Sequence, residues 1–261
     1  MQASPSLNTH AISSGAAPAP RRLVTDAPIR MFHWLFALSF VGAYLTAESE
    51  HWRALHVTLG YSFAGLFGFR VLYGLIGPRQ ARLGLLWRKL GAAPAWLRTV
   101  VSTRSAGSIN WRQGQYLVMA LAVLLMMALV VPLTLSGYAN YNDWGDFLGG
   151  DWIEEVHEFF ANTLLLVVAA HLGMIVLLSL LRRQNQALSM LTGRLPGAGP
   201  SPVQHNRAWL AALLLLAALA FGAWQWQGSP RGLFPGLAGG NTVSVDATGK
   251  MHDRDHEDED D

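Results

Sequence analysis

Four histidines lie in or beside long apolar stretches, and they are the side chains in this chain best suited to bind a metal. They are His33, His56, His157 and His171. A neutral imidazole is a strong metal ligand, whereas an unpartnered polar group in hydrocarbon is costly. Because the chain has no cysteine, thiolate-ligated clusters and covalent CxxCH haem attachment are excluded. Haem held non-covalently by histidine is the chemistry that these residues suit.

The spacing of His157 and His171 sets their phase and depth on one helix. Fourteen residues turn a helix through about 1400°, within about 40° of four whole turns, and advance it by roughly 21 Å. Both imidazoles therefore share one helix face, with His157 near the start of the helix and His171 deeper in it. His56 would form a pair with His157, and His33 would form a second pair with His171. Two imidazoles on one porphyrin give six-coordinate haem iron, which is the usual state for electron transfer.

The elements that must position these histidines are predicted to be membrane-spanning helices. The 261 residues are 51% hydrophobic and only 14% charged, and apolar runs of around 20 residues indicate spans. We expect an all-α membrane protein, with a four-helix transmembrane bundle that holds two b haems and a fifth C-terminal transmembrane helix. The predicted spans are about 29–47, 54–76, 116–138, 152–181 and 208–226.

The predicted domain organisation follows from these spans. Residues 1–28 read as a disordered cytoplasmic tail without the apolar segment of a cleavable signal peptide, and residues 29–182 form the di-haem domain. Within that domain, 79–112 is a cytoplasmic loop whose alternating apolar and basic residues suit the surface of anionic lipid. The remaining segments are a cytoplasmic linker at 183–207, the fifth span at 208–226 and a periplasmic acidic tail at 227–261.

The charge distribution predicts the orientation of the chain. Fourteen of the 19 basic residues lie in the N-terminal segment and in the loops 79–112 and 182–207, whereas the other loops are acidic. Basic residues in short loops stay cytoplasmic. We therefore expect a multi-pass protein of the bacterial inner membrane, with a cytoplasmic N-terminus and a periplasmic C-terminus. Nucleic-acid binding by the basic loop does not fit a segment with membrane on either side.

Other interpretations of the same residues stay open. A histidine in a span can be a hydrogen-bonded interior residue, and the four could bind Zn²⁺, although a transport path would need carboxylates within the spans. Arg70 is a candidate for binding the cofactor through a haem propionate or a quinone oxygen. It could equally reach the lipid headgroups. In the acidic tail, His252 and His256 could bind a divalent metal weakly.

Three stretches of the sequence carry a family resemblance: RMFHWLFALSFVGAYLT, WRALHVTLGYSFAGLFGFRVLYGLIGPRQAR and EEVHEFFANTLLLVVAAHLGMI. They resemble the bacterial b561-type cytochromes, which are grouped with the nickel-hydrogenase cytochrome b subunits, and the likeness covers roughly residues 25–195. The resemblance implies a four-helix di-haem b core, with axial ligands at His33, His56, His157 and His171. The turn at 108–116, SINWRQGQY, departs from the pattern of many members.

The resemblance also implies a function. Members pass electrons between the quinone pool and a periplasmic redox partner, such as a c-type cytochrome or a reductase or hydrogenase subunit. We expect an electron-transfer subunit, more often non-catalytic than an enzyme, with a path from quinol through the His33/His171 haem and the His56/His157 haem to an external acceptor. Nothing in the residues fixes the direction, so the reverse path stays open. The alternative is a stand-alone superoxide:quinone oxidoreductase, which would need a basic outer surface, whereas these outer loops are acidic. A third class is a cation transporter or an anchor subunit without haem.

Overall fold

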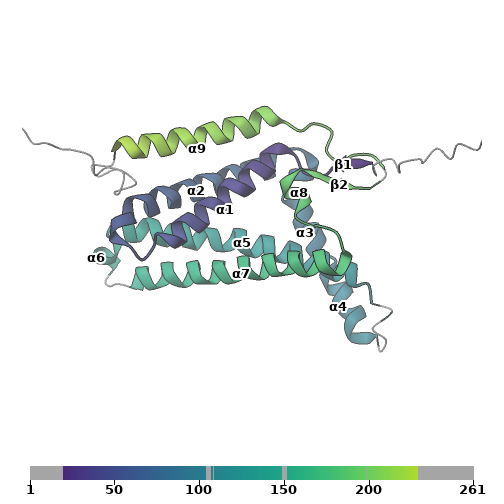
Figure 1. Cartoon of the computed structure of the whole chain (residues 1–261). Coiled ribbons are helices and arrows are strands. Elements are labelled where there is room, and N and C mark those ends of the chain that lie inside the picture. The colour runs from purple at the N-terminus through teal and green to yellow at the C-terminus, as the bar shows by residue number, and fades with distance from the viewer. Residues whose placement is uncertain (1–19, 104–106, 108, 149–151, 198, 229–261) are drawn as a thin grey trace, which may run out of the picture.

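Five long helices run side by side and form the body of the molecule (Figure 1). The structure is a computed structural model, and it describes residues 20–103, 107, 109–148, 152–197 and 199–228. The long helices are α1 (Ala27–Leu45), α2 (Arg53–Ile76), α5 (Trp111–Tyr141), α7 (Trp152–Arg182) and α9 (Ala208–Gly228). Each begins and ends within a few residues of a predicted span, so the mainly helical architecture is confirmed.

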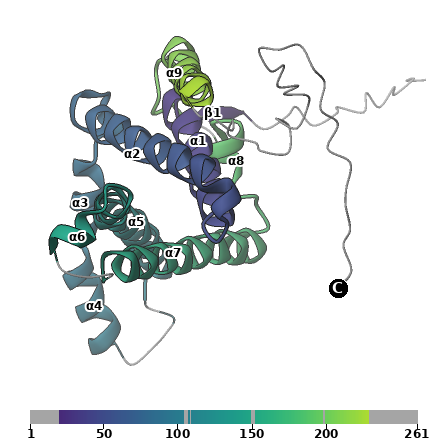
Figure 2. The same cartoon turned by 90° about the vertical axis from the view of Figure 1, so that its left-hand side faces the viewer.

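Four of the described helices are long and apolar enough to cross a membrane. They are α2 together with η1 (Glu50–Trp52), and α5, α7 and α9. The helix α1 falls outside this set, because Arg30, His33 and Trp34 lie within only 19 residues. It packs against α2 and α9, as the end-on view in Figure 2 shows. The chain is a multi-pass membrane protein, and a count of five spans stays a proposal.

The apolar core of the bundle lies midway along the helices. The long helices α1, α2, α5 and α7 all contribute buried side chains to it, namely Phe40, Phe63, Leu129, Val130, Leu133 and Leu164. On α7, Leu164 is seven residues after His157 and seven before His171. The core therefore separates the two histidines of this helix.

The segment before α1 corrects one prediction, that residues 1–28 form a disordered tail. Within it, β1 (Arg21–Leu23) pairs antiparallel with β2 (Arg194–Pro196) from the segment between α7 and α9. The next two backbone N–H groups, of Val24 and Thr25, both donate to the Gly193 carbonyl. The partner strand is far along the chain, so no local pattern indicates the pairing. Residues 1–19 lie outside the described residues.

One buried carboxylate connects three helices at the end of the bundle that carries β1 and β2. Asp26 is fully buried and caps α1, where its Oδ1 accepts a hydrogen bond from the Ile29 N–H. Its Oδ2 accepts a hydrogen bond of 2.5 Å from the Tyr73 hydroxyl on α2 and lies 3.9 Å from the Arg207 guanidinium before α9. This contact sets the position of α1, and therefore of His33, relative to α2 and α9.

Short helices connect the long ones. The predicted interfacial loop contains η2 (Arg79–Ala81), α3 (Gly84–Leu90) and α4 (Ala93–Ser102), which lie at the same end of the bundle as β1, β2 and α8 (Leu188–Leu191). The helix α6 (Trp144–Leu148) lies at the opposite end (Figure 1). We refer to the end with α6 as the outer end and to the end with β1 and β2 as the inner end.

Candidate functional site

Toward the outer end, the structure brings His56 of α2 and His157 of α7 together. Their ring centroids are 6.2 Å apart, and the ring planes are inclined by 78°. A metal–imidazole bond is about 2.0–2.1 Å, and the ring centre lies roughly 1.2 Å beyond the nitrogen, so two rings facing across one metal ion have centroids roughly 6.3 Å apart. The observed separation therefore fits two imidazoles on opposite sides of one iron.

Both outer imidazoles are oriented by backbone carbonyls. Nδ1 of His56 is 2.8 Å from the Ala43 carbonyl oxygen, and Nδ1 of His157 is 3.0 Å from the Leu133 carbonyl oxygen. A carbonyl only accepts, so each Nδ1 carries the proton and each Nε2 keeps its lone pair. A metal-binding histidine typically donates its second N–H in this way. The two rings are thus held in the tautomer that an iron ligand needs.

Glycines allow the helices to bring these carbonyls within reach. A Cβ atom on Gly42 of α1 would lie 2.7 Å from Cδ1 of Leu59, so the glycine lets α2 approach the helix that carries Ala43. A Cβ atom on Gly137 of α5 would lie 2.7 Å from Cε1 of His157. Gly137 therefore makes the space that the His157 ring occupies beside the Leu133 carbonyl.

Toward the inner end, His33 of α1 and His171 of α7 form a second pair. The two side chains are close enough for their charges to interact, and both are partly buried. Nδ1 of each ring is buried, and among the described residues neither atom has a hydrogen-bond partner. The inner pair therefore lacks the carbonyl contacts that orient the outer pair.

The histidines meet as pairs and not as larger clusters. Within the part of the chain that the structure describes, no three residues among His, Cys, Asp and Glu come together as a metal-binding group. A porphyrin supplies four nitrogens of its own and leaves two axial positions, so pairs of histidines suit haem iron. A structural Zn²⁺ site uses four protein ligands instead. The donor set therefore fits haem iron, and at the outer pair the ring separation fits it as well.

The sequence model of prokaryotic cytochrome b561 matches residues 24–193. The chain belongs to this family. It is therefore a b-type cytochrome, which implies haem b and electron transfer across a membrane. The match includes α1, α2, α5 and α7 with all four histidines, whereas α9 lies beyond it. A search of curated proteins and a search of solved structures found no match.

Three of the glycines on α2 of the cytochrome lie where the absence of a side chain could make room for a macrocycle. A Cβ atom on Gly60, Gly65 or Gly68 would have no neighbour within 4 Å among the described residues, so space is open at each. However, Gly65 faces away from the histidines, because it lines a cavity of about 610 Å³ between α2 and α9. Tyr61 and Phe221 also line this cavity. Only Gly60 and Gly68 remain candidates for contact with a cofactor.

Arg70 lies near the inner end of α2, where it has protein partners. Its Nη1 donates to the Ala81 carbonyl at 3.1 Å, beyond the end of the helix. The side chain also interacts electrostatically with Asp26 and Tyr73. These contacts tie α2 to the loop that follows it and to the start of α1. A role for Arg70 in binding the cofactor stays a prediction.

The residues that orient the outer histidines were not predicted from the sequence. On α5 the signal was present: Pro132, Ser136 and Gly137 form an island of small and helix-breaking residues in an otherwise apolar span. The Ser136 hydroxyl lies 3.3 Å from Nδ1 of His157 and also donates to the Leu133 carbonyl. On α1 the contact with His56 is made by the backbone carbonyl of Ala43, and the identity of a side chain does not indicate such a contact.

Proposed function

We propose that this cytochrome carries electrons across the membrane through two b haems, each held by two histidines. His56 and His157 would hold the outer haem, and His33 and His171 the inner one. The observation that carries the proposal is the outer pair, whose 6.2 Å centroid separation and carbonyl-bound Nδ1 atoms match the needs of a shared iron. The inner pair extends the proposal to a second haem, because α7 contributes His157 to the outer pair and His171 to the inner pair.

The chain's own residues would position and insulate the two haems. The Ala43 and Leu133 carbonyls keep the outer Nε2 lone pairs available and fix the ring orientations. The apolar core around Phe63 and Leu164 lies between the two levels and keeps water out. When bound, haem supplies one-electron redox chemistry, while the protein determines its position and surroundings.

We propose the orientation that the charges favour, with the inner end in the cytoplasm. The outer end carries acidic residues, among them Glu48, Glu50 and Asp146, and the inner end carries the arginines of β1, α3 and β2. Electrons would pass between the quinone pool and a periplasmic redox partner, such as a c-type cytochrome or an oxidoreductase subunit. An acidic outer surface would raise the association rate of a basic partner.

Optical and stoichiometric measurements on the purified protein test the haem proposal. A reduced-minus-oxidised spectrum should show b-type bands, and the pyridine haemochrome assay should give two haems per chain. Redox titration should resolve two components, because the outer and inner imidazoles have different surroundings. A spectrum without b-type bands, or one haem per chain, would overturn the di-haem assignment.

The orientation has a separate test, because the chain contains no native cysteine. Glu48→Cys would place a single thiol after α1, and Thr103→Cys would place one after α4. In intact spheroplasts, a membrane-impermeant maleimide should label the first variant and not the second until the membrane is opened. The reverse pattern would invert the topology without affecting the haem result.

A further inference from the structure

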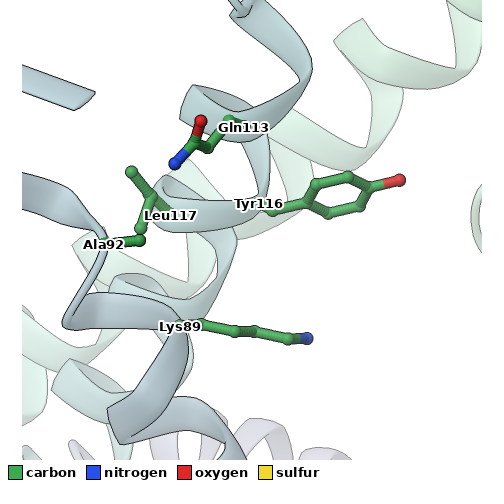
Figure 3. A pocket seen from close by; sticks show the side chains of 5 residues that line it. All are labelled: Lys89, Ala92, Gln113, Tyr116 and Leu117. Carbon is green, nitrogen blue, oxygen red and sulfur yellow. The ribbon is translucent and has the colours of Figure 1, made fainter. Parts of the chain in front are cut away.

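A cavity of about 360 Å³ lies where the α3–α4 segment meets the first turns of α5 (Figure 3). Lys89 and Ala92 line it on one side, and Gln113, Tyr116 and Leu117 line it from α5. Figure 3 shows the Lys89 and Tyr116 side chains extending toward the same side. The cavity therefore combines an ammonium group, a phenol and an amide with an apolar wall.

Trp96 holds the two walls of this cavity in place. Its indole Nε1 donates to the Asn110 carbonyl at 3.1 Å, and Asn110 in turn caps the start of α5. The Trp96 ring also lies against Gly114, where there is no room for a Cβ atom. The α3–α4 segment is thus docked on α5 through specific contacts.

The charge around the cavity is positive, and positive charge would favour an anionic ligand. The sequence contains no acidic residue from position 79 to position 142. Among the described residues, no carboxylate lies within ion-pair distance of Lys89. A second cation is close by, because the Arg182 guanidinium donates to Gln115 and lies 5.9 Å from the centre of the Tyr116 ring. A lysine ammonium group binds phosphate as a point charge.

The position of the cavity indicates that its ligand comes from the membrane. It lies at the inner end, where α5 begins, and Trp87, Tyr116 and Val101 nearby are all more than half exposed. Exposed aromatic and apolar side chains interspersed with cations are typical of the membrane–water interface. We propose that this cavity binds the phosphate headgroup of an anionic phospholipid from the cytoplasmic leaflet, with Lys89 as the main contact. This assignment rests on the proposed orientation.

The test uses the complete purified protein, delipidated in a neutral detergent. The protein is titrated with phosphatidylglycerol, phosphatidylcholine or inorganic phosphate, while native mass spectrometry counts bound lipid and thermal unfolding is followed. Phosphatidylglycerol should bind and raise the unfolding temperature, and the other two should not. Lys89→Gln should weaken phosphatidylglycerol binding about tenfold, since it removes the charge-assisted hydrogen bond from the ammonium group to the phosphate.

A matched control distinguishes lipid binding in the cavity from general attraction of anionic lipid to the basic surface. Arg98 lies on α4 but does not line the cavity, so Arg98→Gln should leave lipid binding unchanged. Equal binding of both lipids, equal stabilisation by inorganic phosphate alone, or an equal loss in both variants would overturn the proposal. The haem spectrum of the same samples reports on the proposed function separately. Selective lipid binding by a protein without b-type bands would uphold this site and overturn that function.

Discussion

The outer and inner histidine pairs differ in what holds their rings. Both Nδ1 atoms of the outer pair meet a backbone carbonyl within 3.0 Å, whereas both Nδ1 atoms of the inner pair are buried with no partner among the described residues. The other buried polar atoms without a partner in the described chain, Nε of Arg22 and Nε of Arg30, also lie at the inner end. The outer site is thus prearranged by the bundle, while the inner site depends on how the ends of the helices are anchored.

The largest expected effect comes from removing a ligand. His157→Ala or His56→Ala should eliminate the outer haem and leave the inner one, so the haem content should fall by about half and one redox component should disappear. His171→Ala or His33→Ala should eliminate the other component. His51→Ala is the control, because His51 is exposed near the same end as His56 and should retain both haems. Unchanged haem content in His157→Ala would refute the assignment.

The second effect tests the space beside the outer ring. In Gly137→Ala, the new Cβ would lie 2.7 Å from Cε1 and 3.0 Å from Nδ1 of His157, so the ring must move. We expect the affinity for the outer haem to fall about 10- to 100-fold, on the scale of disrupting the partner of a ligand. Haem retention during dilution measures it, and the inner component should be unchanged.

Gly222→Ala on α9 is the matched control for that substitution. Space is open at Gly222 among the described residues, so the change should keep both haems and leave stability equal or slightly higher. If both variants lost the outer haem equally, crowding of His157 would not be the cause.

The third effect tests the anchoring of the inner pair. Asp26→Ala removes the acceptor of the Tyr73 hydroxyl and the cap of α1, which should lower the free energy of unfolding by about 2 kcal/mol. Because α1 carries His33, the inner haem should dissociate more readily than the outer one. Thermal unfolding and component-resolved redox titration measure the two effects.

An exposed carboxylate provides the comparison for Asp26. Glu50 pairs with Arg53 at 3.8 Å, but its side chain is 91% exposed. Glu50→Ala should therefore change neither stability nor haem content measurably. Equal loss of both haems in Asp26→Ala would show that the anchor supports the whole bundle and not the inner site.

The smallest expected effect concerns Ser136. Its hydroxyl lies 3.3 Å from Nδ1 of His157, which also contacts the closer Leu133 carbonyl. In Ser136→Ala the carbonyl remains, so the affinity for the outer haem should fall less than tenfold while its redox potential shifts. Redox titration of the two components measures the shift. A shift of the inner component alone would contradict the placement of Ser136 beside the outer site.

Much of the fold could be predicted from local pattern. The long helices follow from apolar runs, and all of them begin and end near the predicted positions. The spacing of His157 and His171 was enough to place them on one face of α7, because helix geometry is local. The pairing of strands β1 and β2 was missed, because their residues are far apart in the chain and neither segment has an alternating pattern.

The sequence by itself determined which residues can bind iron, the helices that carry them and the separation of the two histidines along α7. Only the tertiary structure decided how those rings are held. The Ala43 and Leu133 carbonyls are backbone atoms, and backbone atoms are common to every residue. Their contact with a particular imidazole depends on how closely two helices approach, which side-chain packing at Gly42 and Gly137 decides.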